Sequence, residues 1–178
     1  MFCYLKYTID KEFHRNYFWK TYSTGGYHTV KDPMSDNVRV HKFWWQVFNL
    51  KEVTKNIIND LGLVGKNILP RYSHIKQGHG LRTHVDIDKI VGINFNLMEE
   101  YQPSLTIKNQ KIFYESLLVD VGAVPHSVET VNYDRLVLKL AIREPFNDIM
   151  EILDKKGLID SQTTAIHNLD YKNYISKH

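Results

Sequence analysis

The sequence predicts a mainly β protein with flanking helices, whose short strands form the two sheets of a jelly roll. Between residues 67 and 143, short apolar segments of strand length follow one another. Turn-forming residues such as Gly78-His79-Gly80 and Asn109-Gln110 separate several of them. Helical spacing of apolar residues occurs on either side of this region. Many short strands behind one or two helices are typical of a double-sheet jelly roll.

Length and composition indicate one domain. The chain has 178 residues, which is enough for a sizeable core. We divide it into an N-terminal lobe with a supporting helix (1–66), a jelly-roll core (67–143) and a C-terminal helix and tail (144–178). The single cysteine, Cys3, excludes an internal disulfide and a metal site made of thiolates. No leader pattern opens the chain, so we expect a cytoplasmic protein.

The charge pattern does not point to a particular macromolecular partner. The formal charge is +3, and the 23 lysines and arginines are scattered among 20 acidic residues. Nucleic-acid binders usually cluster their basic residues, so charge alone neither supports nor excludes that partner. The longest apolar runs, such as Leu117-Leu118-Val119, are far too short to span a bilayer, and we expect no membrane partner.

The N-terminal lobe over residues 1–48 is rich in aromatic residues. Turn signals occur in it at Gly25-Gly26 and Asp32-Pro33. Its densest apolar cluster, residues 43–48, is interpreted as core packing beneath the sheet, with a platform for a ligand as the alternative.

A helix is expected directly after this lobe. Asn49 would be its N-cap, with Glu52 three residues on, and it would end near Leu61-Gly62. The apolar residues that fall at helical spacing form a face that covers a sheet: Val53, Ile57, Ile58 and Leu61.

Eight strands are expected in the jelly-roll core, which gives it a cupin-like architecture. They span residues 68–76, 81–86, 90–97, 105–108, 111–114, 117–120, 126–130 and 135–142. A helix over 146–153, closed by Lys155-Lys156-Gly157, should follow them. Residues 160–178 are expected to form a polar tail.

His84, Asp86 and His126 are the candidate metal ligands. His84 and Asp86 are two apart, so on a strand their side chains leave the same face. His126 opens another predicted strand, and strands far apart in sequence face one another in a jelly roll. Two imidazoles and one carboxylate can occupy one side of a ferrous ion and leave the opposite positions open, although manganese and zinc accept the same ligands. Asp88 could compete with Asp86, which we favour because of its minimum same-face spacing from His84.

Arg135 is the candidate anchor for a carboxylate co-substrate. On the strand 135–142, it shares one face with Lys139, while the leucines face the other way. A guanidinium nine residues after His126 could hold a carboxylate through two hydrogen bonds, the alternative being a solvated charge or a structural ion pair. The hydroxyl of Tyr72 could bond the same carboxylate, or Tyr72 could simply fill the core.

Three further polar residues are candidates for contacts to a substrate or co-substrate. Asn94 and Asn96 share one face of the strand 90–97 and could donate amide hydrogen bonds, with solvent-facing positions as the alternative. Arg82 shares the face of His84 and could pair with an acidic substrate group, or it could lie at the surface.

Several of these motifs resemble those of the iron(II)/2-oxoglutarate-dependent dioxygenases. Tyr72 followed by Gly78-His79-Gly80 and His84-Val85-Asp86 resembles the opening motif of the prolyl-4-hydroxylase branch. The later segment resembles the aspartyl/asparaginyl β-hydroxylase branch in Leu105-Thr106-Ile107, Leu118-Val119-Asp120, Pro125-His126-Ser127-Val128-Glu129 and Arg135-Leu136-Val137-Leu138. The match covers residues 67–143 and is specific as an ensemble.

The resemblance implies a double-stranded β-helix in which His84, Asp86 and His126 hold Fe(II). It also implies that Arg135 binds the far carboxylate of 2-oxoglutarate, with Tyr72 assisting. The expected reaction uses O2 to hydroxylate an unactivated C–H bond of an amino acid, a peptide side chain or another small molecule. Succinate and CO2 are then released.

Two departures from these families limit what can be inferred about the substrate. Aspartyl hydroxylases of the compared type usually lack the acidic ligand, whereas Asp86 is present here, so their substrate does not carry over. Nucleic-acid-repair dioxygenases also resemble this chain in residues 84–88, but they have a second arginine where this chain has Ala141. Two alternatives stay open: a cupin-type metalloenzyme that isomerises or hydrolyses its substrate, and a jelly-roll binding module without catalysis.

Overall fold

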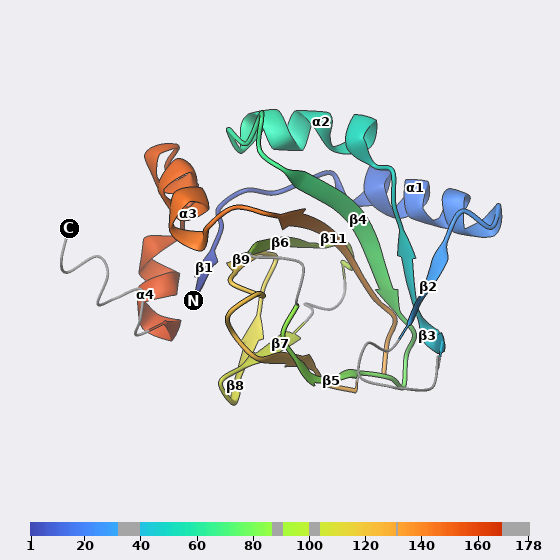
Figure 1. Cartoon of the computed structure of the whole chain (residues 1–178). Coiled ribbons are helices and arrows are strands. Elements are labelled where there is room, and N and C mark those ends of the chain that lie inside the picture. The colour runs from blue at the N-terminus through green and yellow to red at the C-terminus, as the bar shows by residue number, and fades with distance from the viewer. Residues whose placement is uncertain (32–39, 87–90, 100–103, 131, 169–178) are drawn as a thin grey trace.

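The computed structural model describes residues 1–31, 40–86, 91–99, 104–130 and 132–168. In this part of the chain, two antiparallel sheets face each other and the helices lie outside them (Figure 1). The strands are β1 (Phe2–Tyr4), β2 (His28–Lys31), β3 (Val40–Val47), β4 (Ile68–Ile75), β5 (Leu81–His84), β6 (Val91–Asn96), β7 (Ser104–Ile107), β8 (Gln110–Phe113), β9 (Ser116–Val119), β10 (His126–Val128) and β11 (Arg135–Ile142). The helices are α1 (Lys11–Ser23), α2 (Lys51–Asp60), α3 (Phe146–Lys155) and α4 (Ser161–His167).

The larger sheet has the strand order β1-β9-β6-β11-β4-β3-β2, and the smaller one has the order β5-β10-β7-β8. Strands distant in sequence are therefore neighbours, as a jelly roll requires. All eight strands expected between residues 67 and 143 are present, and their bounds differ from the prediction by at most two residues. The mainly β fold with two sheets is confirmed.

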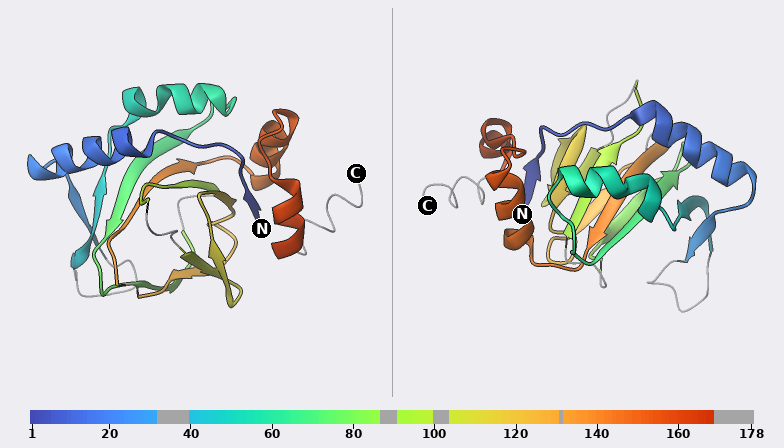
Figure 2. Two further views of the ribbon diagram at one scale, coloured as in Figure 1. Left: turned by 180° about the vertical axis from the view of Figure 1, so that it is seen from behind. Right: turned by 90° about the horizontal axis from the view of Figure 1, so that it is seen from above.

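Side chains on the two faces of the larger sheet pack into two separate cores. The outer core lies beneath α1 and α2, which cover the outer face of this sheet (Figure 2), and it contains the β11 residues Leu136, Leu138 and Leu140. The inner core lies between the two sheets and includes Leu117 and Ile107. Because successive residues of a strand point to opposite faces, β11 contributes Arg135 and Lys139 to the inner side, as predicted.

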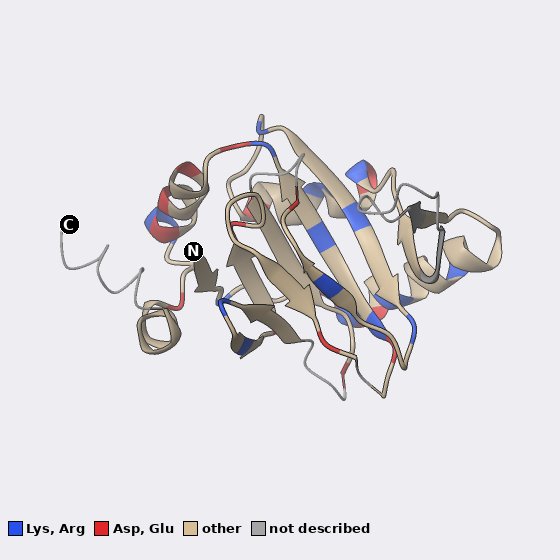
Figure 3. Cartoon of the chain, turned by 60° about the horizontal axis from the view of Figure 1, so that its bottom comes forward, with Lys and Arg blue, Asp and Glu red and all other residues tan. Residues whose placement is uncertain are grey.

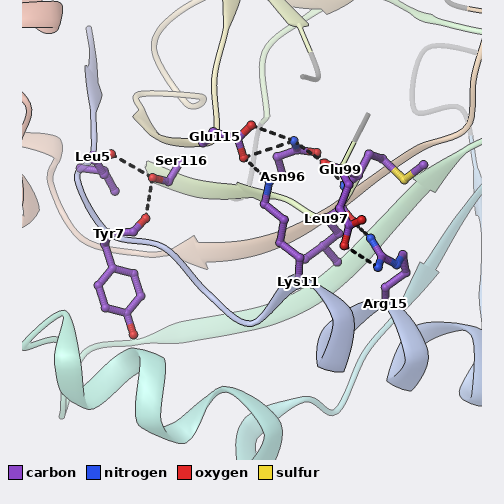
Figure 4. Close-up of polar contacts among 10 residues, drawn as sticks. Leu5, Tyr7, Lys11, Arg15, Asn96, Leu97, Glu99, Glu115 and Ser116 are labelled. Carbon is purple, nitrogen blue, oxygen red and sulfur yellow. Dashed lines mark hydrogen bonds and ion pairs between the residues drawn. The ribbon is translucent and has the colours of Figure 1, made fainter. Parts of the chain in front are cut away.

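Helix α1 was not expected from the sequence. Asp10 caps it by accepting a hydrogen bond of 2.9 Å from the Phe13 backbone N–H. At its N-terminal end Lys11 pairs with Glu115, and Arg15 donates to Glu99 over 2.8 Å (Figure 4). These contacts fasten the helix to the ends of β6 and β9.

The expectations for the other helices are confirmed only in part. Helix α2 ends as predicted, with Gly62 at φ +72, but its N-cap is Leu50, and Asn49 has a φ of 64 instead of capping the helix. Helix α3 extends to Lys155, two residues beyond the predicted end, and Gly157 with φ +68 closes it as predicted. The expected tail is wrong over Ser161–His167, which form α4 behind an Asp160 cap. Among the described residues, none of the helices combines the length and apolar character needed to cross a membrane.

The aromatic cluster at residues 43–48 lies mostly on β3. Val47 is core packing, as interpreted from the sequence, but Trp44 is only half-buried and lines the cavity between the sheets, so the alternative of a ligand platform stays open for it. The Trp44 indole N–H donates to the Ser73 hydroxyl over 2.9 Å on the inner side. Trp45 stacks on His74 on the other side, with ring centroids 5.3 Å apart, and Val47 is buried in the outer core.

Candidate metal centre

The smaller sheet brings His84 and His126 side by side. They are direct register partners in the antiparallel pair of β5 and β10, and their ring centroids are 4.4 Å apart. Asp86 follows β5, where its backbone N–H donates to the Val121 carbonyl over 2.9 Å. One ligand atom from each of the three residues lies within 4.8 Å of the other two. The structure therefore brings together the three residues that the sequence analysis selected.

Backbone carbonyls fix the tautomers of both histidines. The Arg82 carbonyl lies 2.7 Å from Nδ1 of His84, and the Val124 carbonyl lies 3.0 Å from Nδ1 of His126. A carbonyl only accepts hydrogen bonds, so each Nδ1 carries a proton, which leaves Nε2 as the atom of each ring that can bind a metal ion. Burial lowers the pKa of His126 to about 4, so this ring is neutral near pH 7.

This donor set fits a divalent metal ion. The Nε2 atom of His84 is 3.4 Å from Oδ1 of Asp86, close to the roughly 3 Å expected between adjacent ligand atoms that each lie about 2.1 Å from one metal ion. Two neutral imidazoles and a carboxylate on one side of the ion form the arrangement that non-haem Fe(II) sites use. The three residues line a pocket between the two sheets, together with Arg135, Asn94 and Lys139, so small ligands could reach an ion held there.

Arg135 lies buried in the same pocket, where its partner is Tyr114. The guanidinium Nη2 donates to the Tyr114 hydroxyl over 2.8 Å, while its buried Nε has no hydrogen-bond partner among the described residues. Burial raises the pKa of Tyr114, although the charge of Arg135 and a hydrogen bond from Asn94 lower it. Sequence reasoning missed Tyr114, because it follows β8 directly and belongs to no recognisable motif.

Tyr72 lies on the opposite face of the sheet from Arg135, so the prediction that it assists Arg135 is wrong. Its hydroxyl is 2.7 Å from Nδ1 of His14, and its ring contacts that of Phe18 at a centroid distance of 5.8 Å. On β4 the next residue, Ser73, lines the pocket instead. Strand alternation therefore assigns Tyr72 to the outer core, which was the alternative reading of this residue.

The remaining polar candidates separate into two groups. Asn94 is buried and lines the pocket, and its Oδ1 has no hydrogen-bond partner among the described residues. Asn96 is buried too, but its amide makes two hydrogen bonds of 2.8 Å with the Met98 backbone, which shape the turn after β6 (Figure 4). Arg82 is exposed on β5, and Asp88 lies outside the described residues.

Gly80 allows the close approach of the turn before β5 to the end of β10. A Cβ atom there would lie 2.4 Å from the Val128 carbonyl oxygen and 2.8 Å from backbone atoms of the next two residues. We expect Gly80→Ala to displace β5 and to weaken Co(II) binding by about tenfold or more, as loss of ligand support does.

Gly78→Ala is the matched control for this substitution. Unlike Gly80, Gly78 has a positive φ of 77, and nothing lies within 4 Å of its Cβ position, so alanine there strains the backbone of the same turn without a clash. Titration with Co(II) followed by visible absorption measures both variants. Equal Co(II) affinities of the two variants would show that the clash at Gly80 does not displace His84.

Solved structures with the same fold include two prolyl hydroxylases. A prolyl-4-hydroxylase of Pseudomonas putida superposes with a TM-score of 0.60 at 14% identity, covering 76% of this chain and 89% of that one. A Trichoplax adhaerens prolyl hydroxylase, solved with a peptide fragment of the hypoxia-inducible factor oxygen degradation domain, gives a TM-score of 0.57 at 13% identity and covers 80% of each chain. No family model and no curated protein matches the sequence.

A third solved structure with the same fold belongs to an enzyme of a different reaction class. The DMSP lyase DddQ of Ruegeria pomeroyi DSS-3 superposes with a TM-score of 0.50 at 11% identity, covering 78% of this chain and 66% of that one. The chain thus has the jelly-roll fold of prolyl-4-hydroxylases, as the sequence motifs indicate. Because a lyase also matches this fold, the reaction must be argued from the side chains in the pocket.

Proposed function

We propose that this protein is an iron(II)- and 2-oxoglutarate-dependent dioxygenase that hydroxylates a C–H bond of a small molecule or peptide side chain. The observation that carries the proposal is the combination of two features in one pocket. Three side chains of the kinds that ferrous sites use have possible ligand atoms within 4.8 Å of one another, and the buried Arg135 lines the same pocket. Neither feature alone would select this reaction.

The three residues His84, Asp86 and His126 would hold Fe(II), the two imidazoles through their Nε2 atoms. When bound, iron and 2-oxoglutarate supply the oxidising chemistry, and the co-substrate leaves as succinate and CO2. The protein's contribution is to orient both groups and to keep the pocket closed to bulk water. The inner core supplies apolar walls for this purpose, among them Leu105 and Val128.

Arg135 and Tyr114 are suited to hold the far carboxylate of 2-oxoglutarate. The hydroxyl of Tyr114 accepts from Arg135 and keeps its own proton, because burial raises its pKa. It can therefore donate that proton to a carboxylate oxygen. The buried Nε of Arg135 supplies a second donor that has no partner among the described residues, and a carboxylate would satisfy both.

The test measures 2-oxoglutarate turnover and binding. Purified protein with Fe(II), ascorbate, 2-oxoglutarate and O2 is expected to release succinate slowly without a substrate, as followed by NMR. Metal binding without any turnover would support a cupin-type lyase or hydrolase instead. Absence of metal binding would support a binding module.

The two buried tyrosines give a matched pair of variants. Tyr114→Phe removes the hydroxyl beside Arg135 and is expected to weaken 2-oxoglutarate binding by about tenfold, the effect of one lost hydrogen bond to a charged group. Tyr72→Phe removes a hydroxyl of the same kind on the outer face, and we expect it to leave the Kd unchanged. Calorimetric titration of 2-oxoglutarate decides between them, and a larger effect at Tyr72 would reject the assignment of Tyr114.

A further inference from the structure

A second pair of cationic side chains lies on the inner face of the larger sheet. Arg71 on β4 and Lys139 on β11 are direct register partners, and Lys139 lines the pocket. Figure 3 shows basic positions on neighbouring strands in the middle of this sheet. Lys139 is four residues beyond Arg135, roughly 13 Å along the strand, so the two basic groups serve different parts of the pocket.

Arg71 is buried, and its hydrogen-bonding capacity is only partly used. The residue is 4% exposed. Its Nε and Nη2 atoms have no hydrogen-bond partner among the described residues. Burial lowers the pKa of Arg71, while the charge of Asp86 raises it. A buried guanidinium with two unused donors is costly unless a ligand supplies the acceptors.

Basic side chains outnumber acidic ones among the described residues that line the pocket. Asp86 is the only acidic residue among the described residues that line the pocket, and its Oδ2 atom lies 3.9 Å from the Lys139 ammonium. Against this one carboxylate stand two cationic side chains that line the pocket, Arg135 and Lys139, and Arg71 lies next to Lys139 on the neighbouring strand. A divalent metal ion and the 2-oxoglutarate dianion cancel each other, so their binding leaves the positive excess unchanged.

We infer that Arg71 and Lys139 form a second anion-binding subsite, which holds a carboxylate of the substrate. The inference rests on the proposed function and makes the substrate a small carboxylic acid, such as a free amino acid. The Nε and Nη2 atoms form the side-on edge of a guanidinium, whose two parallel N–H donors match the two oxygens of a carboxylate. The depth of Arg71 favours a small molecule over a folded protein.

The first test uses protein loaded with Co(II) and 2-oxoglutarate without O2. A panel of free L-amino acids is compared with the corresponding carboxamides, and the melting temperature is the readout. We expect at least one amino acid to raise the melting temperature and to bind about tenfold or more tightly than its carboxamide. The same amino acid should stimulate succinate release with Fe(II) and O2.

Two arginine variants test whether Arg71 causes this preference. Arg71→Met keeps most of the side-chain volume and should abolish the difference between acid and amide. Arg82→Met is the control, because Arg82 is exposed on β5 and only its backbone carbonyl contacts His84. If no amino acid binds, if acid and amide bind equally, or if Arg71→Met keeps the preference, the subsite does not exist.

Stability without ligand separates a binding role from a structural one. If the unused donors of Arg71 are satisfied only by a bound ligand, the ligand-free Arg71→Met variant should unfold at the same urea concentration as the wild type or at a higher one. A clear drop in the midpoint would make Arg71 a structural residue and overturn the inference. Failure of the proposed function is distinguishable, since it shows as absence of succinate release, while the melting experiment repeated without 2-oxoglutarate still tests the subsite.

Discussion

His126→Ala is expected to abolish the binding of divalent metal ions and, with it, all turnover. His126 is buried between His84 on β5 and Ile107 on β7, so water cannot easily replace the lost imidazole in the same position. Loss of residues that merely support a ligand costs 10- to 100-fold in affinity, so we expect at least about 100-fold here. Titration with Co(II) and detection of succinate measure the two effects.

The control for this substitution is His79→Ala, because His79 is an exposed histidine in the turn before β5 and does not line the pocket. Circular dichroism verifies that both variants are folded. Asp86→Ala should repeat the loss seen with His126→Ala. If His126→Ala binds Co(II) as tightly as His79→Ala does, the three residues are not a metal site and the proposed function is wrong.

The strands could be predicted because their signals are local. In β11 the leucines alternate with Arg135, Val137 and Lys139, and this period of two predicts both the strand and its two faces. Turn residues mark most of the boundaries in the jelly-roll core. The pairing of distant strands could not be read from such signals, because register depends on the whole sheet.

The helix α1 escaped prediction because its buried stripe is narrow. Only His14 and Phe18 among its residues are buried, and Phe13 is half exposed. The helix is held by its Asp10 cap and by aromatic contacts with the sheet, which sequence spacing does not reveal. Helix α4 is short, and its polar residues resemble those of a tail.

The candidate site was predictable where spacing along one strand decided the geometry. The shared face of Arg135 and Lys139 on β11 is such a case. His84 and Asp86 also come together as expected, although Asp86 follows β5 instead of lying on it. Tyr72 was misassigned because a one-residue difference on β4 decides between the outer core and the pocket. Arg71, which precedes Tyr72 on β4 and points to the inner face, was not selected as a candidate for the same reason.

Phe18→Ala should destabilise the protein by about 3–5 kcal/mol, since it empties a fully buried aromatic site between α1 and the larger sheet. The Phe18 ring contacts Tyr72 and His74 of β4 at centroid distances of 5.8 and 5.6 Å. Phe13→Ala in the same helix is the control, and because Phe13 is 50% exposed we expect less than about 1 kcal/mol. Urea unfolding followed by circular dichroism measures both. Equal losses in the free energy of unfolding would mean that α1 does not cover the outer core. The opposite orientations of Tyr72 and Ser73 would then need revision, and the assignment of the pocket face depends on them.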